Sequence, residues 1–146
     1  MRSYCMSAQW WGGHTQADDS VWYDNAGGAT VGLVCRQISK LKNPGAIFLF
    51  VDQVGFNDDA YAAIWYSQAQ WWNIPMYLHS GGSVNGFVDG HVEAYKLGPQ
   101  TAALAQKSAE RAMEVGDYTY TIIPGGFDME DLIFYQRASW GKTGWE

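Results

Sequence analysis

Basic residues are scarce in this chain of 146 residues, and they form no cluster. Lys and Arg together number 9 against 15 Asp and Glu, which gives a formal net charge of -6 at pH 7. Nucleic-acid binding depends largely on clustered Lys and Arg side chains that neutralise phosphate groups. The composition therefore argues against a nucleic-acid partner.

Long apolar runs and common catalytic motifs are also lacking. No stretch reaches the roughly 18 consecutive apolar residues that a membrane-spanning helix requires, and no signal-peptide pattern precedes residue 2. The sequence contains neither a Gly-x-Ser-x-Gly nucleophile elbow nor a Cys-x-x-Cys pair. Its scattered carboxylates are typical of solvated loops and helix caps rather than of hydrolase acid/base pairs. We therefore predict that the protein is not an enzyme.

Aromatic residues, by contrast, are abundant: the chain has 8 Trp, 9 Tyr and 6 Phe, and only 16% of its residues are charged. That balance indicates a folded domain rather than a disordered chain, and the length favours one domain over residues 1–146. We expect about half of the paired aromatic residues to fill the core and the others to form an exposed contact surface. The candidates for that surface are Trp10, Trp11, Trp22, Trp71 and Trp72.

The most informative stretch runs from His79 to Leu97. Asp89-Gly90 lies between two runs of alternating apolar residues, which predicts a β-hairpin closed by a type I′ turn, because both central residues of that turn need a positive φ. Alternation along the second arm assigns its residues to two faces, with Val92, Ala94 and Lys96 on one and His91, Glu93, Tyr95 and Leu97 on the other.

Nine residues separate His79 from Asp89-Gly90. This spacing resembles the signature of a pseudopilin-like, prepilin-type family with a His-x9-Asp-Gly motif, which is related to the major pseudopilins of type II secretion. Residues 38–52 and 2–7 are also similar to the segments that precede the signature in that family. The family positions carry over to His79, Asp89 and Gly90, and the family gives them no established catalytic duty.

The resemblance implies an α+β head domain with a small antiparallel sheet, a central Asp-Gly hairpin and flanking helices. It also implies a non-catalytic structural subunit of an extracellular or periplasmic pilus-like filament of bacteria, which is exported and assembles with copies of itself. Family members begin with a prepilin leader and a long hydrophobic helix, and this sequence shows neither. We expect either a trimmed head domain or a protein that has lost the helix, with membrane contact only through such a helix.

Local patterns place the other elements around the hairpin. Strands are predicted at residues 2–8, 30–35, 46–51 and 118–123, and 46–51 is expected to be a central, fully buried strand. Helices are predicted at 58–68 after an Asn57 cap, at 100–115, and at 129–138 after an Asp128 cap. The loop-rich insertions are 9–28 and 53–78, and the segment 98–146 is predicted to be a helix-strand-helix extension. This mixture also indicates an α+β domain.

His79, Asp89 and His91 are the one constellation of side chains of the kind that bind transition metals. The structural alternative is that Asp89 forms the turn while His79 hydrogen-bonds to loop backbone or to the Asp89 carboxylate. We favour this alternative and expect no metal or cofactor. Calcium, which major pseudopilins often hold in a C-terminal loop, stays an alternative at residues 57–59 and 116–117.

Cys5 and Cys35 are the only cysteines. In an exported protein they would form one disulfide that closes a loop of about 30 residues, worth about 3 kcal/mol on a chain-entropy estimate. Two buried free thiols are the alternative, and both states stay open.

A second functional hypothesis belongs to a different class of protein. Exposed Trp and Tyr side chains would serve a carbohydrate-binding or cell-envelope adhesion module by stacking on the sugar rings of envelope glycans. Both hypotheses expect an extracellular or cell-surface location. They differ in the partner, which is a copy of the same chain in the first and a glycan in the second.

Overall fold

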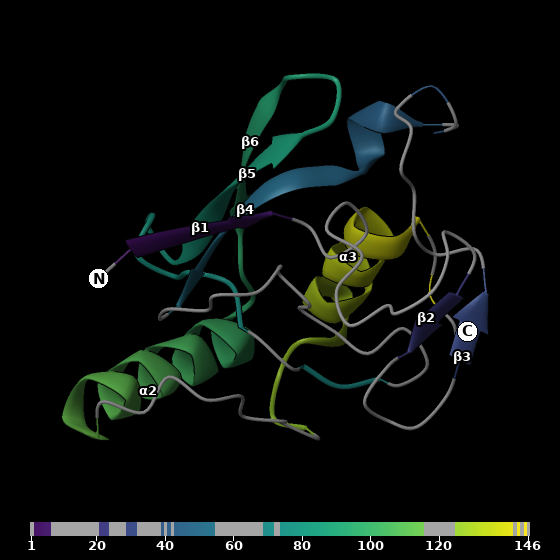
Figure 1. The fold of residues 1–146 in the computed structure, drawn as a ribbon. Coiled ribbons are helices and arrows are strands. Elements are labelled where there is room, and N and C mark those ends of the chain that lie inside the picture. Colours follow the sequence, from purple (N-terminus) through teal and green to yellow (C-terminus); the bar gives the residue numbers. More distant parts are fainter. Residues whose placement is uncertain are drawn as a thin grey trace.

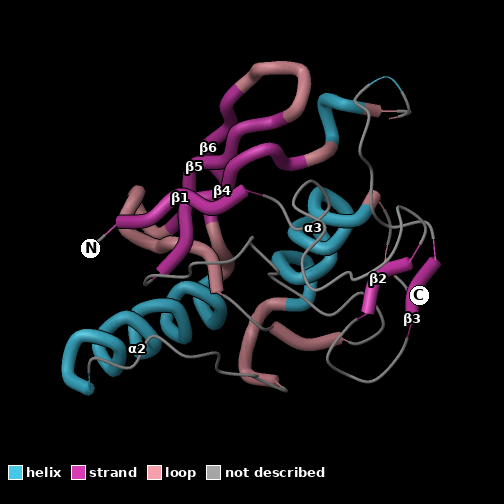
Figure 2. Tube along the Cα trace, viewed as in Figure 1, coloured by secondary structure: helices cyan, strands magenta, loops and turns pink. Residues whose placement is uncertain are grey.

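The computed structural model describes residues 2–6, 21–23, 29–31, 39, 41, 43–54, 69–71, 74–115, 125–141, 143 and 145. In chain order the elements are β1 (Arg2–Met6), β2 (Val21–Tyr23), β3 (Ala29–Val31), the 3-10 helix η2 (Pro44–Ala46), β4 (Phe48–Val54), β5 (Gly82–Phe87), β6 (Val92–Lys96), α2 (Pro99–Val115) and α3 (Met129–Trp140). Figures 1 and 2 show the main sheet with the two helices as separate elements next to it. The predicted α+β class is confirmed.

The main sheet is antiparallel, with the strand order β1-β4-β5-β6, while β2 and β3 form a separate pair. β4 is an internal strand, as its apolar run predicts. A bulge between Phe48 and Phe50 shifts the alternation, so that Phe48 and Val51 are both buried and Phe50 is 48% exposed. The prediction that this strand is buried on both faces was therefore wrong at Phe50.

β5 and β6 form the predicted hairpin, but the turn between them is of another type. Gly90 has a φ of 95°, whereas Ser80 is the one described non-glycine residue with a positive φ, so Asp89 lacks the φ that a type I′ turn needs. Gly90 N donates to Phe87 O at 3.0 Å, and Phe87 N donates to His91 O at 2.9 Å. The loop therefore has three residues, a type I turn followed by a left-handed glycine. The Asp-Gly pair suits this turn as well as a type I′ turn, because both place Gly90 at a positive φ, which glycine alone adopts without strain.

α3 packs across one face of β4 and β5. The core residues that the two layers contribute are Phe48, Val51 and Phe87 from the sheet and Leu132, Tyr135 and Ala138 from the helix. The rings of Phe48 and Tyr135 lie with their centroids 5.4 Å apart. The helix begins where the sequence predicts and continues to Trp140, beyond which Gly141 adopts a left-handed φ of 78°.

The beginnings of the two helices are joined by Asp128. Its Oδ2 accepts hydrogen bonds from Gln100 N at 2.8 Å and Thr101 N at 3.1 Å, and Asp128 N donates to Thr101 Oγ1 at 2.9 Å. Asp128 makes no side-chain cap to its own helix, so that prediction was wrong. The carboxylate lies instead at the first turn of α2, where unpaired N–H groups and the helix dipole favour a negative charge.

Several other predictions are answered only in part. The strand predicted at 2–8 corresponds to β1, and the helix predicted at 100–115 corresponds to α2. The helix predicted at 58–68 and the strand predicted at 118–123 lie outside the described residues. None of the helices in the described part of the chain is long and apolar enough to cross a membrane.

Gly98 connects β6 to α2, and a Cβ atom there would collide with the Asp128 carboxylate. Because two backbone N–H groups hold this carboxylate, we expect Gly98→Ala to lower the free energy of unfolding by about 1–3 kcal/mol in urea denaturation. Gly125→Ala is the matched control, since nothing lies within 4 Å of a Cβ at that position, and should change stability by no more than about 0.5 kcal/mol. Equal losses in the two variants would contradict this account.

Candidate functional site

His79 lies in the turn that leads into β5, and its side chain contacts β4. Its Nε2 is 2.8 Å from Oδ2 of Asp52, which is completely buried, whereas the His79 side chain is 27% exposed. Gly81 N donates to Tyr77 O at 3.0 Å and closes the turn. Two alternatives were predicted for His79, loop backbone or the Asp89 carboxylate, and its side chain bonds to Asp52, which neither of them named. The Asp89 alternative is wrong, because the extended strand β5 separates the two residues by about 20 Å at roughly 3.3 Å per residue.

Asp89 instead pairs with His91 at the tip of the hairpin. The Asp89 Oδ1 atom lies 2.6 Å from His91 Nδ1 and accepts a hydrogen bond from His91 N at 3.2 Å. These hydrogen bonds hold the pKa of the Asp89 carboxyl below its ordinary value. The His91 ring stacks on Phe87, with the centroids 4.2 Å apart and the planes at 7°. A Cβ on Gly45 of η2 would come within 2.8 Å of Asp89 Oδ2, so the tip also approaches η2 closely.

The three side chains of the metal-type constellation therefore serve two separate pairs. His79 belongs with Asp52, and Asp89 belongs with His91. Within the described ranges, no group of three or more His, Cys, Asp and Glu side chains is arranged to hold a metal ion. The calcium alternatives at residues 57–59 and 116–117 lie outside those ranges.

A buried polar network that the sequence analysis missed joins α3 to β5. The hydroxyl groups of Ser83 and Tyr135 are hydrogen-bonded to each other, Ser83 Oγ donates to Asn85 Oδ1 at 3.2 Å, and Asn85 Nδ2 donates to Tyr135 Oη at 3.5 Å. All three residues are fully buried, and burial raises the pKa of the Tyr135 hydroxyl. The available signal was the placement of Ser83 and Asn85 on the same strand face as Phe87, from which they lie four and two residues away.

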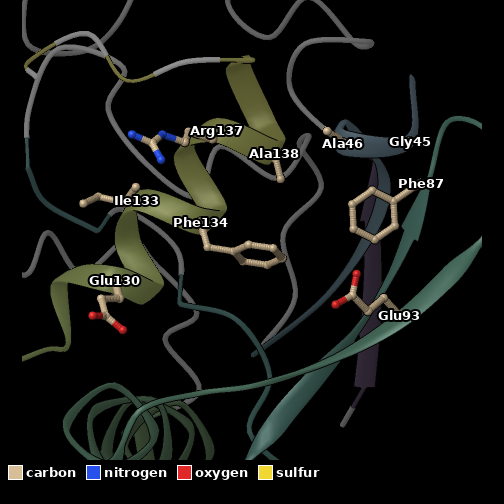
Figure 3. Close-up of a pocket in the computed structure, with 9 residues that line it drawn as sticks. All are labelled: Gly45, Ala46, Phe87, Glu93, Glu130, Ile133, Phe134, Arg137 and Ala138. Carbon is tan, nitrogen blue, oxygen red and sulfur yellow. The ribbon is translucent and has the colours of Figure 1, made fainter. Parts of the chain in front are cut away.

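A cavity of about 580 Å³ opens between α3 and the hairpin (Figure 3). Figure 3 shows Phe134 of α3 and Phe87 of β5 on its two sides, with the Glu93 side chain of β6 directed into the space. Glu130, in the first turn of α3, also lines it. Phe134 stacks on Tyr95, with the centroids 3.9 Å apart. Arg137 of α3 lines the cavity as well, so the charged groups beside its aromatic walls are two carboxylates and one guanidinium. Local patterns could not predict this cavity because α3 and β6 are distant in sequence.

Trp71 is the one tryptophan of the predicted exposed surface whose side chain the structure describes. It is fully buried, and its ring centroid lies 5.5 Å from that of Tyr135 and 6.2 Å from that of Phe127. The predicted contact role is therefore wrong for Trp71, which fills the core beside α3. The other surface candidates, Trp10, Trp11, Trp72 and the side chain of Trp22, lie outside the described residues. Cys35 and the side chain of Cys5, the candidates for a disulfide, also lie outside them.

Comparisons with protein family models, with curated proteins and with solved structures gave no match for this chain. The resemblance of its His79 to Asp89-Gly90 pattern to the pseudopilin-like signature therefore stays a prediction.

The two His–Asp pairs differ in burial and predict different losses on mutation. His79→Ala removes a donor from a fully buried carboxylate, so we expect the free energy of unfolding to fall by about 1–3 kcal/mol. His91→Ala is the matched comparison, because the Asp89 side chain is 42% exposed and water can replace the lost hydrogen bond, so the loss should be smaller. Urea denaturation of both variants measures the difference, and the reverse order would contradict the assignment.

The Asp89–His91 pair also predicts a pH effect. Because His91 donates hydrogen bonds to Asp89, the Asp89 pKa in the folded chain lies below 3.8, the ordinary value. A carboxyl whose pKa is lowered by folding stabilises the protein above its unfolded pKa, and this contribution is lost as the pH falls through the folded pKa. We expect a ¹³C NMR titration of Asp89 to show a midpoint below 3.8 that rises in His91→Ala. A midpoint that His91→Ala leaves unchanged would rule out this cause.

Proposed function

We propose that this chain is the globular head of a pseudopilin-like structural subunit, exported from a bacterial cell and assembled with copies of itself in a pilus-like or pseudopilus-like filament. The proposal starts from the His79 to Asp89-Gly90 pattern. It is supported by the small antiparallel sheet into which that pattern is built.

The observation that carries the proposal is the bond between His79 Nε2 and the buried carboxylate of Asp52. This bond fastens the turn before β5 to β4, and at the other end of β5 the Asp89-Gly90 turn joins β5 to β6. Both ends of the signature thus hold neighbouring strands in place. Holding strands in place is the role that a structural subunit would require of these residues.

The outer face of the same sheet supports an assembly role. Phe50 on β4 is 48% exposed and Val92 on β6 is 68% exposed. The register aligns Phe50 with Gly86 and Gly86 with Val92, so the two apolar side chains flank a glycine across three adjacent strands. Exposed apolar area of this kind is suited to contact with another subunit.

Filaments sheared from the surface of the native cells provide the test. We expect an antibody against this chain to label them along their length in electron microscopy, and mass spectrometry to identify the chain as a main component. Filaments from cells that lack the gene are the matched control and should be missing or shortened. Labelling confined to other envelope material, with filaments unaffected by the deletion, would contradict the proposal.

A further inference from the structure

β6 is the last strand of the main sheet, and in the described part of the chain it pairs only with β5. Val92, Glu93, Ala94 and Lys96 are all exposed. The strand contains no proline, and its pairing with β5 has no bulge. Natural sheets protect an edge from pairing with another chain by proline, by bulges and by charged side chains, and of these devices β6 has only the charges of Glu93 and Lys96. Among the described residues, β6 therefore presents an unpaired edge to which a further strand can be added.

The hydrogen bonds at both ends of the hairpin show which backbone groups of β6 face this edge. Phe87 N donates to His91 O, and Leu97 N donates to Gly81 O. Bonded and non-bonded pairs alternate along an antiparallel ladder, so Glu93 and Tyr95 also direct their backbone groups toward β5. The N–H and C=O groups of Val92, Ala94 and Lys96 consequently point to the open edge.

The length and the charges of β6 together favour one way in which two copies of the strand can pair. If Ala94 lies opposite Ala94 of the second copy, Val92 faces Lys96 of that copy and Glu93 faces its Tyr95. All five residues of the strand are then paired, and no like charges lie opposite each other. Shifting this register by one pair in one direction places Glu93 opposite Glu93, and like charges directly opposite destabilise a sheet. Shifting it in the other direction places Tyr95 opposite Tyr95 and leaves Val92 and Glu93 without a partner in the second β6 strand.

We infer that the β6 edge is the surface through which this chain binds a second copy of itself, by antiparallel pairing of the two β6 strands about a two-fold axis at Ala94. The inference rests on the proposed function for the expectation that copies meet, and it names the contact. The four-stranded sheets then form one continuous sheet, and both copies of α3 cover the same face of it. The aliphatic stem of Lys96 from each copy covers the exposed Val92 of the other.

Two substitutions of opposite charge at Val92 test the register. Val92→Glu places a carboxylate opposite Lys96 of the second copy, whereas Val92→Lys places two ammonium groups opposite each other. We expect the dissociation constant of the Lys variant to exceed that of the Glu variant by about tenfold in sedimentation equilibrium. Net charge alone predicts the reverse order, because the chain already carries -6. The difference should shrink in roughly 1 M NaCl, where the Debye length is about 3 Å.

Ala103→Glu and Ala103→Lys, at an exposed position of α2, are the matched controls and should differ only as net charge predicts. Self-association that responds to the Val92 pair as stated supports the inference. Self-association with no difference between the Val92 variants beyond that of the controls overturns the β6 contact and leaves the filament proposal standing. A chain that stays monomeric at millimolar concentration also overturns the contact, whereas the filament proposal is decided separately by the sheared filaments.

Discussion

The arrangement of the described layers depends on the hydrogen bonds that Tyr135 of α3 makes with Ser83 and Asn85 of β5. A buried polar group without a partner costs about 1–3 kcal/mol, so these three side chains have to meet. The apolar residues around them, such as Phe48 and Leu132, tolerate small shifts because dispersion and hydrophobic contacts are not directional. The hydrogen bonds do not tolerate such shifts, and they set the position of α3 along the sheet.

Two carboxylates connect α3 and the residue before it to β6 and to α2. Asp131 of α3 accepts hydrogen bonds from Tyr95 Oη at 3.0 Å and from Gly98 N at 2.9 Å. Burial, together with the charge of Asp131, raises the pKa of Tyr95, whose hydroxyl donates to this carboxylate. Asp128, three residues earlier, holds the first turn of α2. One helix thus connects the edge strand β6, the Gly98 junction and the second helix.

The open edge and the His-x9-Asp-Gly pattern belong to the same hairpin. β5 is held at one end by the contact of His79 with Asp52 and at the other by the turn at Asp89-Gly90. β6 has no comparable support on its outer side within the described residues. A strand that is well ordered by its neighbour yet unpaired at its edge is suited to extend a sheet into a second molecule, because little further ordering is needed on binding.

The sequence by itself determined the hairpin, the two faces of β6 and the approximate positions of α2 and α3, because these features depend on residues close together in the chain. The sequence did not determine which side chains and backbone groups form hydrogen bonds with each other. Asp128 precedes a helix and so predicts a cap for that helix, yet the N–H groups it binds belong to the other one. His79 and Asp52 lie 27 positions apart, and nothing local indicates that they meet. Only the tertiary structure decided these pairs and the burial of Trp71, because hydrogen bonding and burial depend on proximity in space between segments distant in the chain.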